Sequence, residues 1–86
     1  MTRKGNLIGK QVSKSRNHLG LSQSDLAAKC QLIGWDLSRD VLARIESGVR
    51  GISDKEIAIF SDVLGVPVQE LLPPRIAQGY VKRLRG

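Results

Sequence analysis

One pattern recurs three times along this 86-residue chain: an apolar residue, a serine, and a second apolar residue five positions after the first. A serine that begins a helix accepts a hydrogen bond from an unpaired backbone N–H, and the flanking apolar pair packs as a hydrophobic staple. The pattern therefore predicts three helices, each ended by a glycine. The starts are Leu21, Ser22 and Leu26; Leu37, Ser38 and Leu42; and Ile52, Ser53 and Ile57, and the glycines are Gly34, Gly48 and Gly65.

Two further helices complete the prediction. An earlier helix is indicated by apolar residues that share one helical face before a glycine: Ile8, Val12, Leu19 and Gly20. Pro67 suits the first turn of a short last helix that ends at Leu72, before two prolines. Glu56 completes a capping box, and Asp25 is a shorter substitute for one. No stretch alternates long enough to indicate a sheet, so the sequence predicts an all-α fold, a compact bundle of five short helices.

Composition limits what this bundle can contain. Its length suits one domain, and aromatic residues are only 3% of the chain, so the core must be aliphatic. Cys30 and His18 are the single cysteine and histidine, which excludes an internal disulfide and leaves no set of zinc ligands. Cys30 falls with Leu26 and Ile33 on the inward side of its helix, as a core residue does. We therefore expect no metal, no cofactor and no enzymatic activity.

Positive charge is concentrated at the two ends of the chain. The net charge is +6, yet residues 1–20 and 74–86 contain no acidic residue, while all eight carboxylates lie between them. A polyanion such as nucleic acid is the natural partner of cationic ends, although basic termini can also serve solubility alone. No apolar run approaches the roughly 18 residues that cross a bilayer, so we expect a soluble, cytoplasmic protein without membrane contact.

Two opposite charges occupy positions where a helix should be apolar. Glu46 follows Ile45 on the edge of the stripe formed by Leu42, Ile45 and Val49, and Arg16 lies four residues after Val12. A carboxylate loses solvation there unless it meets a charge. These positions favour a buried ion pair between Arg16 and Glu46 over the alternative, a surface pair of Glu46 with Arg50.

Three stretches resemble, in order, the helix-turn-helix family of phage repressors and Cro proteins, often called the XRE family. They are "SRNHLGLSQSDLAAKC", "LSRDVLARIESGVRG" and "IAIFSDVLGVPVQELL", and the resemblance covers residues 7–72. In that family an arginine before "LGLSQ" pairs with a glutamate in the "IE.G" stretch, which corresponds here to Arg16 and Glu46. Together with the basic residues at both ends of the chain, the resemblance predicts a basic N-terminal arm (1–6), a helix-turn-helix domain (7–73) and a short basic C-terminal tail (74–86).

The resemblance also implies which residues read DNA. The helix over about 39–47 would enter the major groove of double-stranded DNA, and the residues placed at base edges are Arg39, Asp40, Val41, Ala43 and Arg44. Val41 lies near the core edge by periodicity, and Asp40 has the alternative role of positioning Arg39. For the two arginines the alternative is an ordinary solvated face. Ala43 is small enough to let the backbone approach a base.

Phosphate contacts are expected from the start of the second predicted helix and from scattered cations. The candidates are Ser22, Gln23, Arg50, Arg3 and Lys4. For Gln23 the alternative is a polar residue that fills the first helical turn. One such module buries little surface on DNA, so we expect a homodimeric transcriptional repressor on a palindromic operator, with half-sites ~34 Å apart.

One departure from the family pattern and one rival function remain. Between Ala27 and Ile45 the chain has about five residues more than the common family spacing, which predicts a longer second helix and an exposed Trp35 in an enlarged turn. The Trp35 region or the basic tail would then suit a protein partner. The rival function is therefore a protein-binding regulator, such as an antitoxin or an adaptor, built on the same fold.

Overall fold

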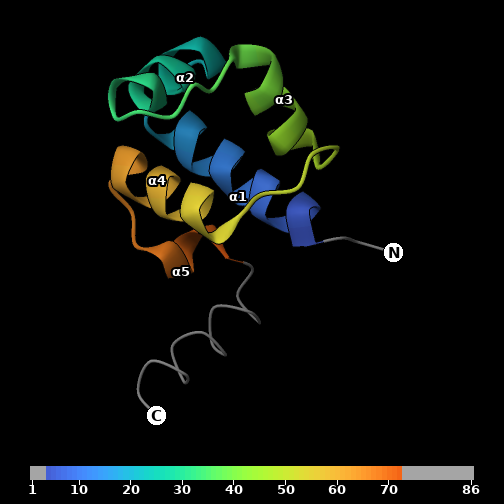
Figure 1. Ribbon diagram of the computed structural model, residues 1–86. Helices are drawn as coiled ribbons and strands as arrows, with labels where there is room; N and C mark the ends of the chain where they lie inside the picture. The colour runs from blue at the N-terminus through green and yellow to red at the C-terminus, as the bar shows by residue number, and fades with distance from the viewer. Residues whose placement is uncertain (1–3, 73–86) are drawn as a thin grey trace.

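A computed structural model of the chain describes residues 4–72, with side chains from Ile8 onward. Its helices, coloured in order in Figure 1, are α1 (Lys4–His18), α2 (Gln23–Leu32), α3 (Arg39–Ser47), α4 (Asp54–Leu64) and α5 (Val68–Leu71). The predicted all-α fold of five helices is confirmed for this part of the chain. The backbone is already helical at Lys4, before the expected domain start at residue 7, and the expected tail at 74–86 lies outside the described residues.

The serine starts form as the sequence predicts. Ser22, Ser38 and Ser53 each accept a hydrogen bond from the backbone N–H three residues later, at 3.0, 3.1 and 3.2 Å. Asp25 and Glu56 complete two capping boxes by accepting from the backbone N–H of the first and third serine. These caps satisfy N–H groups that have no partner inside the helix. Local sequence therefore determines where α2, α3 and α4 begin.

Three apolar residues expected on inward faces are instead exposed. Gly48 ends α3 in the left-handed conformation (φ 83°), which only glycine adopts readily, and the chain then leaves the helical path. Val49, just beyond it, is 76% exposed. Leu19 and Ile33 likewise follow the last residues of α1 and α2, and each is 49% exposed. Those three predictions are wrong because helical periodicity does not continue past the end of a helix.

The core lies where α1, α2, α3 and α4 meet, and it is aliphatic apart from Phe60 and Cys30. Its buried residues are Ile8, Val12, Leu26, Ala27, Cys30, Leu37, Leu42, Ile45, Ile57, Phe60, Leu64 and Leu71. Each buried Leu, Ile or Val contributes roughly 1.5–3 kcal/mol of transfer free energy. The interior therefore contains at least one residue of each apolar staple, both residues in the pair Leu37 and Leu42, together with the inward faces of the helices.

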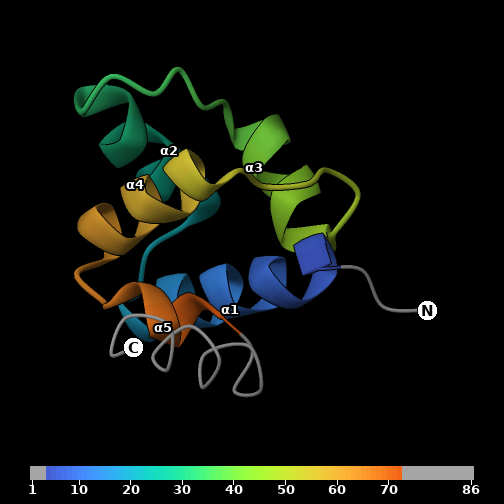
Figure 2. The ribbon, with the colours of Figure 1, turned by 60° about the horizontal axis from the view of Figure 1, so that its bottom comes forward.

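The helices are arranged around α1. In Figure 1 α1 crosses the centre of the molecule, with α2 and α3 above it and α5 below it. Figure 2 shows the C-terminal end of α3 next to the first turns of α1, while α4 lies beside α2 and leads into α5. The outer side of α3 consequently faces away from the other helices. Within residues 4–72 no helix has both the length and the apolar character needed to cross a membrane.

Candidate nucleic-acid interface

Arg16 of α1 and Glu46 of α3 form a bidentate ion pair. The Arg16 Nε donates to Glu46 Oε2 at 2.7 Å and the Arg16 Nη2 donates to Glu46 Oε1 at 2.9 Å. The two side chains are only 11% and 7% exposed. The surface alternative is not formed, because Arg50 binds Glu56 instead. The two charges that interrupt apolar faces in the sequence therefore meet between α1 and α3.

Two further polar groups complete this cluster. The Arg16 Nη1 donates to the Leu21 carbonyl at 2.8 Å, and the Gln23 Nε2 donates to Glu46 Oε1 at 3.1 Å. The hydrogen bond to Glu46 raises the pKa of Arg16 above its usual value, so the guanidinium stays charged. One carboxylate thus joins α3 both to α1 and to the first residue of α2.

The side of α3 opposite the core carries exposed charge. Leu42 and Ile45 are fully buried, while the Arg39 and Asp40 side chains are 62% and 84% exposed and Arg44 is also exposed. The Arg44 guanidinium makes no hydrogen bond with any residue that the structure describes. Arginine presents a planar set of donors that matches paired acceptors. This side of α3 can therefore donate hydrogen bonds to an external ligand without disturbing the core.

The other predicted base-reading residues differ in exposure. Arg39 Nη1 lies 3.3 Å from Asp40 Oδ1, a contact that suits the alternative in which Asp40 positions Arg39. Val41 is half-buried and packs against the core, and Ala43 is half-buried as well. All five predicted residues lie on α3, but Arg39, Asp40 and Arg44 stand further out than the two apolar ones.

The start of α2 offers backbone donors beside a carboxylate. Ser22 is engaged with Asp25 in the capping box, whose hydrogen bonds lower the pKa of Asp25 and keep it ionised at neutral pH. Within residues 4–72 nothing accepts from the backbone N–H groups of Gln23 and Ser24. Two donors at this helix start are therefore available, while the Gln23 side chain already donates to Glu46.

Arg50 is held within the loop between α3 and α4. Its Nη1 and Nη2 donate to the two carboxylate oxygens of Glu56 at 3.1 and 3.0 Å, which lowers the pKa of Glu56 and raises that of Arg50. The Arg50 side chain remains 38% exposed, but its charge is balanced by that of Glu56. Arg3 and the side chain of Lys4 lie outside the described residues.

The succession of α2, a connecting turn and α3, with one exposed side on the second helix, is a helix-turn-helix arrangement. Residues 12–71 match the sequence profile of the helix-turn-helix family, which is well over half of the chain. The chain belongs to the helix-turn-helix family. This assignment confirms the resemblance noted from the sequence.

Two solved structures are similar to this helix-turn-helix chain, and both are described as the DNA-binding domain of BldD. The S. venezulae BldD domain is 32% identical, with a TM-score of 0.70, and the match covers 84% of this chain and all of that one. A crystal structure of the BldD domain is also 32% identical, with a TM-score of 0.71 and coverage of 85% and 100%. No curated protein matches the chain. Similarity to DNA-binding domains agrees with the expectation that the chain is not an enzyme.

The long turn of the helix-turn-helix unit is packed rather than free. Trp35 is half-buried, with its ring edge-on to Phe60 of α4 at 5.0 Å between centroids. Gln31 Nε2 donates to the Leu37 carbonyl at 2.7 Å, and Leu37 is buried. The prediction of an exposed Trp35 is therefore wrong, because its ring packs against Phe60, which lies in α4 and is distant in the sequence. The start of α3 is fixed by these contacts despite the added residues.

The hydrogen bond from Gln23 to Glu46 was missed by sequence reasoning. The pattern placed Gln23 at a helix start, and the family resemblance suggested a phosphate contact, which stays a prediction. The structure shows a hydrogen bond from its side chain to a residue 23 positions later, in the second helix of the helix-turn-helix unit. No periodicity reports such a contact, since it depends on how α2 and α3 cross.

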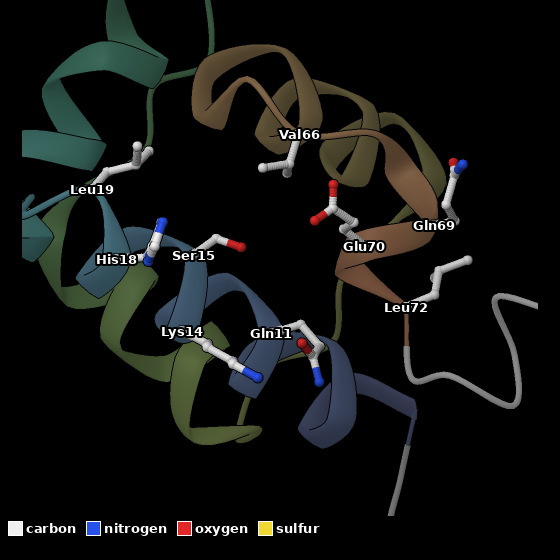
Figure 3. A pocket seen from close by; sticks show the side chains of 9 residues that line it. All are labelled: Gln11, Lys14, Ser15, His18, Leu19, Val66, Gln69, Glu70 and Leu72. Carbon is white, nitrogen blue, oxygen red and sulfur yellow. The ribbon is translucent and has the colours of Figure 1, made fainter.

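A groove of about 470 Å³ lies on a different part of the surface, between α1 and α5 (Figure 3). Its lining residues are Gln11, Lys14, Ser15, His18, Leu19, Val66, Gln69, Glu70 and Leu72. None of them belongs to α2 or α3, so the groove is separate from the helix-turn-helix surface. Among the described residues, no His, Cys, Asp or Glu side chains gather in a group of three that would hold a metal ion.

Proposed function

We propose that this chain is a sequence-specific DNA-binding transcriptional regulator that inserts α3 into the major groove of double-stranded DNA. The observation that carries the proposal is that Arg39 and Arg44 of α3 are exposed to solvent while Glu46 ties the same helix to α1. The similarity to the BldD DNA-binding domain supports DNA as the ligand. An α-helix fits the width of the major groove.

Base reading follows from the donors and acceptors on α3. Each arginine can donate two hydrogen bonds to O6 and N7 of a guanine, and Asp40 either accepts from cytosine N4 or holds Arg39 in place. Val41 and Ala43 supply small apolar surface at the edge of this face. Because Arg39 and Arg44 lie more than one helical turn apart, they address different base pairs of one half-site.

Phosphate contacts position the helix on the duplex. The free backbone N–H groups at the start of α2, near Ser22 and Gln23, form an anion site of the kind that helix N-termini provide. Arg50, Arg3 and Lys4 are the cations proposed to contact phosphates beside it. Each lost phosphate contact reduces the slope of log K against log salt by about 0.9.

The regulator acts as a homodimer in this proposal. A single module of this size buries roughly 600–1,000 Å² on DNA, whereas tight specific binding usually needs more. Two copies about a twofold axis would read a palindromic operator with half-sites ~34 Å apart. A dimer bound there prevents other proteins from using the same DNA, which is the action of a repressor.

Selection of bound sites from randomised duplex DNA at fixed salt tests this function. We expect a palindromic site with guanines in each half. Arg39→Ala and Arg44→Ala should each cost about 1–3 kcal/mol at one base pair and relax the preference there. Lys55→Ala, which removes an exposed cation from α4, is the matched control and should leave base preference unchanged. Equal losses for all three variants, or no enriched sequence, would contradict the proposal.

A protein-binding regulator is the second candidate, and exposed apolar side chains favour it. Leu32 is 86% exposed beside the exposed Ile33, at the end of α2 and away from the arginines of α3. Exposed apolar surface often marks a protein contact. Under this function, the double variant Arg39→Ala with Arg44→Ala keeps its protein partner, whereas Leu32→Asp loses it.

A further inference from the structure

Gly9 lies in the middle of α1, where the helix touches the last turn of α3. It is buried, and its backbone is not in the left-handed region. A Cβ atom at this position would lie 2.1 Å from the carbonyl oxygen of Ile45 and 3.1 Å from that of Glu46. Glycine is the poorest helix former after proline, so local preference alone would favour alanine here. The missing side chain is therefore required by the neighbouring backbone and not by α1 itself.

The two contacts from α1 hold the same end of α3. Gly9 meets the carbonyl groups of Ile45 and Glu46, and Arg16, two turns further along α1, binds the Glu46 carboxylate. The other end of α3 is held separately, by the buried Leu37 and its hydrogen bond from Gln31. The position of Gly9 thus determines how closely the C-terminal half of α3 approaches α1.

We propose that Gly9 is a positioning residue for DNA reading, which sets the tilt of α3 without touching DNA. This inference rests on the function proposed above. The distance of 2.1 Å between a Cβ at position 9 and the Ile45 carbonyl oxygen is 1.3 Å shorter than the 3.4 Å at which ordinary contact begins. The oxygen belongs to the backbone, so it cannot move aside as a flexible side chain would. The start of α3 is fixed and lies roughly 9 Å along the helix axis from Ile45. If Ile45 moves away by the missing 1.3 Å while that start stays in place, α3 tilts by about 8°.

The tilt has an unequal effect on the two arginines. Arg39 lies at the pivot and moves little, whereas Arg44, next to Ile45, moves by about 1 Å. Hydrogen bonds to base edges require donor–acceptor distances of about 2.7–3.2 Å, so a shift of this size breaks the Arg44 contact first. The phosphate donors at the start of α2 are not on the moving end. Sequence preference is therefore lost while general affinity for DNA is kept.

Gly9→Ala tests this inference, with Gly51→Ala as the matched control because a Cβ at Gly51 meets no atom within 4 Å. For Gly9→Ala we expect roughly a ten- to hundredfold loss of affinity for the selected site and less than about threefold for random DNA. The lost preference should fall at the base pair read by Arg44, and Gly9→Ala should cost nothing further in an Arg44→Ala background. Gly51→Ala should keep both affinities.

Residual dipolar couplings of the free protein provide a readout that does not depend on DNA. They should report a rotation of α3 relative to α1 by about 8° in Gly9→Ala and none in Gly51→Ala. If the wild-type chain selects no DNA sequence, the proposed function fails while this measurement still decides whether position 9 sets the tilt. Leu64→Val, a destabilising change in the core of α4, should lower stability and leave the ratio of specific to random affinity unchanged.

Several results would overturn the inference. One is a Gly9→Ala variant whose ratio of affinity for the selected site to affinity for random DNA is unchanged. Another is an equal loss of affinity for the selected site and for random DNA, and a third is a loss that adds to the loss caused by Arg44→Ala. If Gly9→Ala is unfolded at 25 °C, the measurements are made in trimethylamine N-oxide, which favours compact states. Failure to fold even there also overturns it, because position 9 would then determine folding and not the orientation of one helix.

Discussion

Glu46→Ala removes the carboxylate on which three elements converge. The variant deletes two hydrogen bonds from Arg16 and one from Gln23. The Arg16 guanidinium keeps its hydrogen bond to the Leu21 carbonyl but loses its counter-charge in a site that is 11% exposed. An uncompensated charge in such a site is the expensive consequence of breaking a buried pair.

The expected cost follows from this environment. Breaking a buried pair by removing one partner typically costs about 3–5 kcal/mol. Because Arg16 retains one acceptor and some solvent contact, we expect the lower end, about 3 kcal/mol. For a domain of this size each kcal/mol lowers the melting temperature by roughly 4–8 °C, so the midpoint should fall by roughly 12–24 °C.

Urea unfolding followed by circular dichroism measures the difference directly. Asp40→Ala is the matched control, since it removes a carboxylate of the same helix that is 84% exposed and should cost less than about 0.5 kcal/mol. Arg16→Met combined with Glu46→Leu should recover most of the loss, because an apolar pair leaves no stranded charge. The reasoning is refuted if Glu46→Ala costs no more than Asp40→Ala.

Acid and thiol chemistry give two further predictions. Hydrogen bonds from Arg50 lower the pKa of Glu56, and those from Ser22 lower the pKa of Asp25, so both carboxylates stabilise the fold at neutral pH. That contribution is complete above the unfolded values, about 3.9–4.3, and is lost as pH falls through the lower folded values. The urea concentration at the unfolding midpoint should therefore decrease as the pH is lowered below about 4. In Glu56→Gln this decrease should be smaller, and an equally steep decrease in the variant would show that the pair contributes nothing. Burial raises the pKa of the Cys30 thiol to about 11, so a thiol reagent at pH 8 should label the folded chain far more slowly than the urea-unfolded chain. Equal labelling rates would mean that Cys30 is not buried in solution.

Local patterns predicted the helices well because caps and stops act within a few residues. The Ser38 hydroxyl accepts a hydrogen bond from the backbone N–H of Val41, three positions later. Gly48 adopts the left-handed conformation that ends α3. The ion pair of Arg16 with Glu46 was also predictable, since each charge interrupts an apolar stripe. Such an interruption is visible in sequence, although the partner 30 residues away must be inferred.

Other features were not predicted because they depend on how one element meets another. Trp35 was expected in solvent, yet it packs on Phe60, which lies 25 residues later. The hydrogen bond from Gln23 to Glu46 was not predicted either, and the assignment of Gln23 to phosphate stays a prediction. Both contacts depend on the angle at which helices cross, and no helical period encodes that angle.

The amino-acid sequence by itself determined the five helices of the described residues, the serines that begin α2, α3 and α4, and the two opposite charges that form an ion pair. These follow from backbone hydrogen bonds and apolar spacing, which are short-range properties. The tertiary structure alone decided that the backbone of α3 lies directly against Gly9 and that the long turn packs against α4. Distances between distant backbone segments arise only when all the helices pack at once, and they fix which side of α3 is available to a ligand.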